Sequence, residues 1–386
     1  MRILTINSGS SSIKFSVYDV DDAERLEVSG RFERIGLPSG MFEAKGPGKP
    51  PLAGEKIRVE DHAQAIGRLL LFLEKEAVRV DAVGHRLVHG GPEFTGMGLI
   101  DDRLVRKLGG LSAFAPEHLP HQLSAVEACR NAFPRLPQVA CFDNAFHATM
   151  PGVACAYPLP PGFREEGIRR YGFHGLSYEY MAGELKAMGR GGRAVIAHLG
   201  NGASMCAIRD GRSVDTTMGF TPAGGLMMSS RTGDLDPGVI IYLLKEKGLS
   251  PDEVNRLVNH GSGLLGVSGT STDMEDLLLR EKTDPAAREA VELFCYLAKK
   301  FLGSLVAALG GLETLVFTAG IGENSPEVRA RICAGLGFMG IELSPERNSR
   351  NEAVISTDGS GVKVMAIKTN EELMMARHVK KAVSEG

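Results

Sequence analysis

The sequence predicts an α/β fold in which one domain design is used twice, with a cleft between the two copies. Apolar strands that run directly into glycine-rich turns occur in both halves of the chain, within residues 2–20, 193–215 and 314–324. Segments with helical apolar spacing lie between these units. The length of 386 residues also favours two domains, because a single core rarely grows to that size.

The first strand unit is predicted to be a hairpin. Residues 2–7 and 13–20 alternate apolar and polar side chains, and a glycine with several serines forms the turn between them. Residues 29–61 are rich in glycine and proline, which indicates further hairpins and exposed loops. Residues 61–77 predict a helix that begins after Asp61, whose side chain suits an N-cap.

The second half repeats the strand pattern and adds long helices. Residues 193–215 predict strands joined by an Asn-Gly turn and an Asp-Gly turn. A long apolar-faced helix is expected over residues 284–309, where Asp284 and Pro285 suit the cap and the first position. Residues 371–385 predict a closing helix, since acidic residues occupy its first turn and basic residues follow.

Composition and charge argue against several classes of protein. The net charge of −3 gives no broad basic surface for nucleic acid or an anionic membrane. No run of about 18 apolar residues is present, and the apolar run at the N-terminus is too short for a secretory signal. The six cysteines form no CxxC pair and stand in apolar contexts, which predicts buried thiols in a cytoplasmic protein.

Three glycine-rich turns are candidates for phosphate binding. Residues 7–14 place hydroxyls, backbone N–H groups and a lysine after a strand, although the second glycine of a Walker A loop is absent. Residues 198–204 form a similar turn; two such turns favour a phosphate clamp, with plain hairpins as the alternative. Residues 320–324 end a strand and precede a helix capped by Ser325, a position that suits nucleotide phosphate or ribose.

Histidine and arginine residues supply the other candidates. His85 and His89 have a spacing that would suggest a zinc pair on a helix, but their segment predicts a strand running into Gly-Gly-Pro, so zinc is not expected. Arg86 lies on the same strand and points away from its histidine neighbour. Arg231 stands in a loop rich in glycine and aspartate. The guanidinium fork of each arginine suits a carboxylate or a phosphate, and a surface ion pair is the alternative.

Nine segments, in order over nearly the whole chain, together resemble the acetate kinase family, which includes propionate and butyrate kinases. They are residues 7–14, HRLVHGG at 85–91, CFDNAFH at 141–147, RRYGFHG at 169–175, HLGNGAS at 198–204, TTMGFTP at 216–222, LMMSSRTGDLDP at 226–237, FTAGIGEN at 317–324 and TNEEL at 369–373. Several are long and have no obvious packing role, so chance explains them poorly.

This resemblance implies a fold and an assembly. The family belongs with sugar kinases, heat-shock 70 proteins and actin, so a duplicated actin-like ATPase fold with ribonuclease H-like domains and a central nucleotide cleft is expected. The N-terminal domain would span residues 1–148 and be joined by the C-terminal helix 370–386. The C-terminal domain, residues 149–369, would carry the nucleotide site and the interface of a homodimer.

The resemblance also implies an activity: reversible, direct in-line transfer of the γ-phosphoryl group of ATP to acetate, giving acetyl phosphate and ADP, with Mg²⁺ or Mn²⁺. Arg86 and Arg231 would bind the carboxylate and the transferring phosphoryl group, and His174 would contact the phosphoryl group in the transition state. Asp143 and His118 match two further active-site positions.

The remaining implied residues would hold the metal, the nucleotide and the acyl group. Asn7 and Glu371 match the positions tied to the metal. The nucleotide and its phosphates match Ser10, Ser12, Lys14, His198, Asn201, Gly202, Asp273, Met274, Gly320, Ile321 and Asn324. The walls of the acyl pocket match Val88, Phe173 and Pro222.

Elementary chemistry agrees with this set of residues. A carboxylate substrate is already ionised at neutral pH, so no general base is needed to form the nucleophile. The remaining task is to position two anions and neutralise their charge, which calls for arginines, a histidine and a divalent ion. We therefore expect Asp143 to orient an arginine or a metal-bound water rather than to act as a base.

The chain departs from the family pattern at four places, and these keep alternatives open. Glu117 replaces an apolar residue of the acyl pocket, and Glu275 replaces an arginine near the adenosine. FHGTSH reads FHGLSY here, ending at Tyr178, and a glutamate is missing from residues 223–228. A propionate or butyrate kinase, another phosphoryl donor such as pyrophosphate, and a nucleotide-gated binding module are the alternatives.

Overall fold

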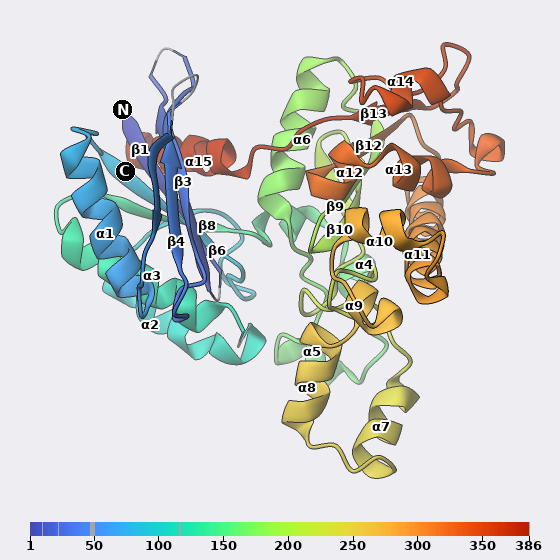
Figure 1. Ribbon diagram of the computed structural model, residues 1–386, viewed down its shortest axis with the longest axis horizontal. Coiled ribbons are helices and arrows are strands. Elements are labelled where there is room, and N and C mark those ends of the chain that lie inside the picture. The colour runs from blue at the N-terminus through green and yellow to red at the C-terminus, as the bar shows by residue number, and fades with distance from the viewer. Residues whose placement is uncertain (10, 22, 47–50, 116, 386) are drawn as a thin grey trace. The chain divides into compact units, whose positions relative to one another are not determined.

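The computed structural model describes residues 1–9, 11–21, 23–46, 51–115 and 117–385 (Figure 1). The chain divides into two compact units. Unit 1 comprises Met1–Phe146 and Asn370–Gly386, and unit 2 comprises His147–Thr369. Each unit has its own sheet and its own helices, and each is described separately.

Unit 1 contains an eight-stranded mixed sheet in the order β5-β4-β3-β2-β1-β6-β8-β7. Its strands are β1 (Arg2–Ser8), β2 (Ser12–Asp19), β3 (Arg25–Glu33), β4 (Met41–Lys45), β5 (Pro51–Lys56), β6 (Ala82–Leu87), β7 (Gly98–Leu99) and β8 (Gln138–Phe142). β1 through β5 pair antiparallel in sequence order, whereas β1, β6 and β8 run parallel to one another. The predicted hairpins at residues 2–20 and 29–61 are therefore confirmed.

The helices of unit 1 cover both faces of this sheet. They are α1 (His62–Lys75), α2 (Asp102–Gly110), α3 (Leu119–Ala132) and the C-terminal α15 (Glu371–Glu385). Asp61 caps α1 as predicted, since its side chain accepts a hydrogen bond from the Gln64 N–H. Val83 of β6 joins the core under α1, while its neighbour Gly84 faces Val379 of α15. Because adjacent strand residues point to opposite faces, α1 and α15 lie on opposite sides of the sheet.

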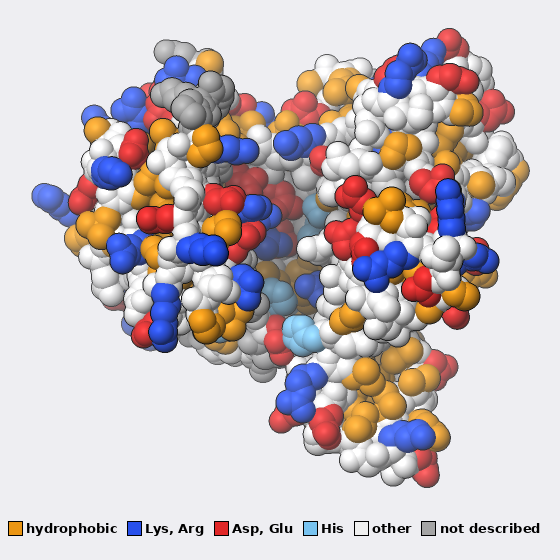
Figure 2. Space-filling view, viewed as in Figure 1, with side chains coloured by type: hydrophobic (Ala, Val, Ile, Leu, Met, Phe, Trp, Pro, Cys, Tyr) orange, Lys and Arg blue, Asp and Glu red, His pale blue; other side chains and the backbone are white. Residues whose placement is uncertain are grey.

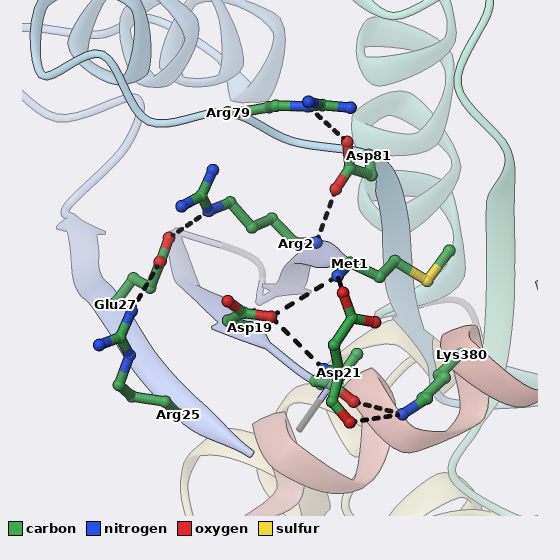
Figure 3. Close-up of polar contacts among 10 residues, drawn as sticks. Met1, Arg2, Asp19, Asp21, Arg25, Glu27, Arg79, Asp81 and Lys380 are labelled. Atoms are coloured by element: carbon green, nitrogen blue, oxygen red, sulfur yellow. Dashed lines mark hydrogen bonds and ion pairs between the residues drawn. The ribbon is translucent and has the colours of Figure 1, made fainter. Parts of the chain in front are cut away.

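Helix α15 is fixed to unit 1 along its length (Figure 1). Arg377 makes two hydrogen bonds of 2.7 Å to the Glu24 carboxylate. Lys380 donates to the backbone carbonyls of Val20 and Asp21, and Figure 3 shows Lys380 beside Asp21. Figure 3 also shows the start of β1, where the Asp81 side chain accepts the N–H of Arg2. Arg377 and Lys380 thus fix the middle of α15 to unit 1. Beside its N-terminal end, which carries Glu371, the Tyr18 hydroxyl donates to the Asn370 side-chain oxygen at 3.1 Å.

Unit 2 contains a five-stranded sheet in the order β11-β10-β9-β12-β13. Its strands are β9 (Arg193–Leu199), β10 (Ala203–Arg209), β11 (Arg212–Thr216), β12 (Thr314–Thr318) and β13 (Lys363–Ala366). The first three form antiparallel hairpins, and β9, β12 and β13 run parallel. Strands β3-β2-β1-β6-β8 of unit 1 have the same order and directions. The predicted duplication is thus present in the topology.

Unit 2 is richer in helices than unit 1. They are α4 (Gly152–Cys155), α5 (Pro161–Glu165), α6 (Gly175–Ala187), α7 (Pro237–Lys245), α8 (Pro251–His260), α9 (Gly263–Ser268), α10 (Met274–Arg280), α11 (Pro285–Leu309), α12 (Ala319–Asn324), α13 (Pro326–Cys333) and α14 (Pro345–Ser349). Asp284 and Ser325 cap α11 and α13 as predicted. One prediction needs correction: residues 320–324 are a one-turn helix rather than an open turn, entered through Ala319 at φ +65°.

The cysteines and the length of the apolar helices test two further expectations from the sequence. All six cysteines are free and buried, as the sequence predicts: Cys129, Cys141, Cys155, Cys206, Cys295 and Cys333. Within the described residues, none of the helices is both long enough and apolar enough to span a bilayer.

Candidate active site

In unit 1, Arg86 joins two other predicted site residues. Its Nη2 donates to Asp143 Oδ2 at 2.7 Å, and its Nη1 donates to Asn7 Oδ1 at 3.3 Å. Asn7 lies near the end of β1, Arg86 near the end of β6, and Asp143 directly after β8. These strands are parallel neighbours, so their carboxyl ends meet at one edge of the sheet, where ligands bind in such folds.

The charges in this group influence one another strongly. Burial alone would lower the pKa of Arg86, but the negative charges of Asp143 and Glu371 outweigh it and raise that pKa. Burial raises the pKa of Glu371 above its ordinary value, and Asp143 adds to the rise although Arg86 opposes it. Asp143 is almost fully buried, with 1% of its side chain exposed. A buried carboxylate of this kind must be paired, and the Arg86 guanidinium pairs it.

The donor set in unit 1 fits a divalent cation. Asn7 offers an amide oxygen, and Asp143 and Glu371 offer carboxylate oxygens, which are the hard ligands that Mg²⁺ and Mn²⁺ prefer. The side chains of the described ranges contain no group of three His, Cys, Asp or Glu residues already arranged to hold an ion. Glu371 is brought to this group by α15, from the far end of the sequence.

The first glycine-rich turn connects β1 to β2. The Gly9 N–H donates to the Ser12 carbonyl at 2.8 Å, and Nε2 of buried His62 lies 2.7 Å from the Gly9 carbonyl oxygen. Lys14 is exposed and pairs with Asn7 in the strand register. Ser10, also predicted to bind phosphate, lies outside the described residues. The turn is thus held by a hydrogen bond to His62, a residue that the sequence reasoning did not select.

A second unselected residue, Gln122, connects the ends of β1 and β6. Its Oε1 accepts the N–H of Val88 at 3.0 Å, and its Nε2 donates to the Ser8 carbonyl at 3.4 Å. Val88, the predicted acyl-pocket residue, is 3% exposed. His118, whose catalytic role was predicted, precedes α3 and is half-buried, as is its neighbour Glu117. Gln122 lies on α3 three residues after its start, so helix spacing alone gave no signal for it.

His85 and His89 have separate hydrogen-bond partners. His85 Nε2 lies 2.8 Å from the Gln138 side-chain oxygen, and His89 Nδ1 accepts the Gly91 N–H at 2.7 Å. Burial lowers the pKa of each imidazole to about 4. Both rings are therefore neutral at pH 7 and have separate contacts, in contrast to the paired arrangement of a zinc site.

In unit 2, His174 stands at the entrance to α6 with a left-handed backbone, φ +58° and ψ +27°. Its Nδ1 lies 2.8 Å from the Ser204 hydroxyl on β10. Its ring stacks on His198 of β9, with centroids 4.2 Å apart. Few non-glycine residues adopt this backbone conformation, and those that do cluster at functional sites.

The second glycine-rich turn brings His174 and Arg231 together. A Cβ atom built on Gly202 would lie 3.1 Å from His174 Nε2 and 3.7 Å from Arg231 Nη1. Arg231 Nη1 also donates to the Pro222 carbonyl at 3.1 Å. The Asn201 carbonyl accepts the Ser229 N–H at 3.2 Å. Glycine at position 202 therefore leaves room for the His174 imidazole and the Arg231 guanidinium to approach the turn.

The third segment, α12, lies next to this turn, and hydrogen bonds from Arg329 hold it in place. A Cβ atom on Gly200 would be 3.6 Å from Ala319 and 3.9 Å from the Gly320 nitrogen. Fully buried Arg329 donates to the carbonyls of Gly322 and Glu323, at 2.8 and 2.9 Å. Its other hydrogen bonds go to Asn348 and Asn351. Burial lowers the pKa of Arg329 to about 10, so its charge persists at pH 7 among neutral oxygens.

The other predicted residues of unit 2 occupy more ordinary positions. Asp273 caps α10 by accepting the N–H groups of Glu275 and Asp276, and the Glu275 side chain is exposed. Met274 is buried in the first turn of that helix. Asn324 donates from its side chain to the Gly320 carbonyl at 2.9 Å, which closes α12, and Ile321 is half-buried within it. Phe173 is buried with 1% of its surface exposed, and its carbonyl lies 3.0 Å from His147 Nε2.

The predicted residues thus form two groups, one within each unit. Asn7, Arg86 and Asp143 are hydrogen-bonded in unit 1, with Glu371 electrostatically linked to them. In unit 2, His174, His198, Gly202, Arg231 and Pro222 form a connected set. The sequence reasoning missed the residues that support these groups: His62, Gln122, Ser204, Arg329 and Tyr178, whose hydroxyl is hydrogen-bonded to that of Ser204.

Comparison with known proteins gives consistent matches along the chain. The model of the acetokinase family matches residues 2–377. An acetate kinase from Rhodopseudomonas palustris is 46% identical over 388 residues, covering 98% of this chain and 97% of its own. An acetate kinase from Coprothermobacter proteolyticus is 46% identical over 393 residues, covering 98% of each chain.

Solved structures give the same result. The crystal structure of Porphyromonas gingivalis acetate kinase matches with a TM-score of 0.90 at 35% identity, over 99% of both chains. The structure of a propionate kinase from Francisella tularensis matches with a TM-score of 0.93 at 36% identity, over 98% of this chain and 99% of that one.

Proposed function

The chain belongs to the acetokinase family, and from that premise we propose a division of labour between its two groups of site residues. The activity is that of an ATP:acetate phosphotransferase, which uses ATP or ADP together with a divalent metal. The observation that best supports the assignment is the Asn7–Arg86–Asp143 group at the carboxyl edge of the sheet in unit 1. The preferred metal is proposed to be Mg²⁺, with Mn²⁺ as a substitute.

Arg86 and Arg231 bind the two anions in this proposal. Asp143 orients Arg86, because its buried carboxylate accepts a hydrogen bond from Nη2 and so fixes the guanidinium at the carboxyl edge of the sheet. Arg231 and His174 present N–H groups over the Gly202 turn, where phosphoryl oxygens would accept them. Acetate is ionised already, so none of these residues has to remove a proton.

The metal and the nucleotide are assigned to the remaining residues. Asn7 and Glu371 would hold Mg²⁺, which neutralises charge on the phosphates of ATP. The turns that carry Ser12, Lys14, Asn201 and Gly202 would contact those phosphates, with Ser10 and His198 as further candidates. Asp273, Met274 and the α12 residues Gly320, Ile321 and Asn324 would line the nucleoside site. His118 is proposed to contact the acyl or phosphoryl group.

The acyl pocket is proposed to favour a short chain. Val88, Phe173 and Pro222 are apolar and match the pocket positions of the family, although half-buried Glu117 replaces an apolar residue there. A longer acyl chain would have to displace or contact this carboxylate, and packing an apolar chain against a carboxylate removes part of its solvation at a cost. The match to a propionate kinase keeps propionate as the second candidate substrate.

An assay of acyl phosphate as the hydroxamate tests the proposal directly. Acetate, propionate and butyrate would each be combined with ATP or pyrophosphate and Mg²⁺. Arg86→Ala and Arg231→Ala are expected to lower kcat by about 10³-fold, which is typical for loss of a group that stabilises transition-state charge. Arg79→Ala and Arg350→Ala, which remove exposed arginines in surface ion pairs, are the matched controls. Full activity in either active-site variant would remove that arginine from the mechanism.

The assembly and location are also proposals. Four side chains of α7, Val239, Ile241, Tyr242 and Leu244, expose between 36% and 53% of their surface. Apolar side chains gather on this part of the surface (Figure 2). A second copy of the chain is the proposed partner for this face, because an apolar patch of this kind commonly marks an interface. Free buried thiols support a cytoplasmic location, and the net charge of −3 favours no nucleic-acid partner.

A further inference from the structure

Two hydroxyl groups, those of Ser204 and Tyr178, form a series of hydrogen bonds that ends at Nδ1 of the His174 imidazole. The Tyr178 hydroxyl on α6 forms a short hydrogen bond with the Ser204 hydroxyl on β10. Ser204 Oγ lies 2.8 Å from His174 Nδ1. Tyr178 and Ser204 are both fully buried, at 0% exposed. The ring of Tyr178 is also held in place between His147 and His198, with edge contacts of 5.6 and 6.5 Å between ring centroids.

The number of hydrogens available fixes which group donates in each of these two hydrogen bonds. A buried hydroxyl has one hydrogen and must donate it, and the partners of the Ser204 hydroxyl are His174 Nδ1 and the Tyr178 oxygen. A phenol is a stronger acid than an alkyl alcohol, so Tyr178 is the better donor to Ser204. Ser204 then donates to His174 Nδ1, which must accept. In a neutral imidazole whose Nδ1 accepts, Nε2 carries the hydrogen.

The other end of the ring faces the second glycine-rich turn. His174 Nε2 lies 3.1 Å from the position that a Cβ on Gly202 would occupy, with Arg231 Nη1 close by. An N–H at Nε2 therefore points its hydrogen toward the same space as the Arg231 guanidinium. An unprotonated Nε2 would instead present a lone pair there, which would repel a phosphoryl oxygen.

We propose that Tyr178 and Ser204 are positioning residues that hold His174 as the Nε2–H tautomer, so that it donates a hydrogen bond to the transferring phosphoryl group. The inference rests on the proposed role of His174, and it adds two residues to the machinery. No proton is transferred between Tyr178, Ser204 and His174. The two hydroxyls determine that Nε2, and not Nδ1, of the imidazole is the donor. Tyr178 is also where this sequence departs from the family's FHGTSH pattern, so the tyrosine hydroxyl is a feature of this chain.

Nuclear magnetic resonance of the histidine ring nitrogens tests the tautomer without reference to activity. The protein would be labelled with ¹⁵N in its histidine rings at a pH where His174 is neutral, and the His174→Gln spectrum identifies the signals that belong to this residue. We expect a protonated Nε2 and an unprotonated Nδ1 in the unsubstituted protein. Ser204→Ala should give a mixture of tautomers, and Tyr178→Phe a smaller change in the same direction. A protonated Nδ1 in the unsubstituted, neutral ring would overturn the proposal.

Kinetics provide the second test. Tyr178→Phe and Ser204→Ala should each lower kcat by about tenfold, the effect of losing roughly one hydrogen bond, with a smaller change in the KM for ATP. Because both act through Nδ1, the double variant should be no worse than Ser204→Ala alone. Tyr171→Phe removes a comparable buried hydrogen bond, from the tyrosine hydroxyl to the Gly167 carbonyl, and should change neither kcat nor the His174 spectrum.

The outcomes separate this inference from the function on which it rests. Strictly multiplicative losses in the double variant would overturn it, as would full kcat in Tyr178→Phe with an unchanged His174 spectrum. Full activity in His174→Ala would instead reject the proposed role of His174 itself. If Ser204→Ala does not fold, the spectrum of the unsubstituted protein and the Tyr178→Phe kinetics still decide the question.

Discussion

At the scale of single residues, the backbone of His174 gives a prediction about stability. Its left-handed conformation costs a residue with a Cβ about 1 kcal/mol, a cost that glycine does not bear. His174→Gly should therefore be more stable to urea than His174→Ala by about 1 kcal/mol, while both lack the imidazole and lose activity. Equal stability of the two variants would mean that the backbone relaxes once the ring is removed.

The buried histidines of unit 1 predict how stability depends on pH. His85 and His89 have a pKa lowered to about 4 in the folded chain, against 6.5 as their ordinary value. The unfolded chain therefore binds more protons between these values, and stability falls as the pH is lowered. From pH 7 to pH 5 the free energy of unfolding should drop by about 2 kcal/mol for each histidine.

Urea unfolding of unit 1 at several pH values would measure this drop, with matched variants as controls. His85→Gln retains a donor to Gln138, and His89→Asn retains an acceptor for the Gly91 N–H. Each should remove the contribution of its own histidine, about 2 kcal/mol between pH 7 and pH 5, while buried His62, whose pKa is also lowered by burial, contributes separately. A pH dependence that is unaffected by both substitutions would assign the effect to other groups.

What the sequence predicts at this scale depends on whether a residue carries a local pattern. Arg86 and Asp143 each follow a strand pattern into a distinctive motif, and the structure joins them at 2.7 Å. Tyr178 and Ser204 are 26 residues apart on a helix and a strand, and nothing local to either predicts that their hydroxyls meet. Arg329 likewise reads as an ordinary helix residue until Asn348 and Asn351 are placed around it.

At the scale of secondary-structure elements, the close contact between β6 and α15 is sensitive to the addition of a single methyl group. A Cβ on Gly84 would lie 2.6 Å from Val379 Cγ2, so Gly84→Ala should push α15 from the sheet. Overpacking of this kind costs about 1–3 kcal/mol. Urea unfolding should show that loss, and adding Val379→Ala should recover most of it. A stable Gly84→Ala variant would show that α15 can shift without cost.

The elements themselves follow largely from local chemistry. The hairpin of β1 and β2 and the caps of α1, α11 and α13 agree with the sequence reasoning, because alternation and capping are local signals. The parallel pairing of β1 with β6 and of β9 with β12 does not follow from them, since it joins distant segments. The short helix α12 was missed because two of its six residues are glycine, a poor helix former.

At the scale of the whole molecule, the surface of α7 predicts the oligomeric state. Sedimentation of the unsubstituted protein should give twice the chain mass of 41.3 kDa. Ile241→Glu, which places a charge in the middle of the exposed apolar face, should give the single-chain mass. Leu71→Glu alters a comparably exposed leucine on α1 and should leave the dimer intact. A dimer that survives Ile241→Glu would locate the interface elsewhere.

The repeated sheet is the feature of the whole molecule that the sequence anticipates best. Both units have the same central order of five strands, and the glycine-rich turns predicted from the sequence follow β1 and β9, which are equivalent strands. The additional strands β4, β5 and β7 of unit 1 and the helices α7 to α10 of unit 2 distinguish the two copies. These additions follow no repeat, so the sequence pattern predicts them only one element at a time.

The six buried thiols can serve as built-in probes of unfolding in each of the two units. Cys129 and Cys141 lie in unit 1, and the other four lie in unit 2. Burial raises the pKa of Cys129 in unit 1, and of Cys295 and Cys333 in unit 2, to about 12, so we expect alkylating reagents to modify these thiols only slowly while the chain is folded. The urea concentration at which each cysteine-containing peptide gains the mass of the reagent would therefore report the unfolding of the unit that contains it. No label has to be introduced by mutation.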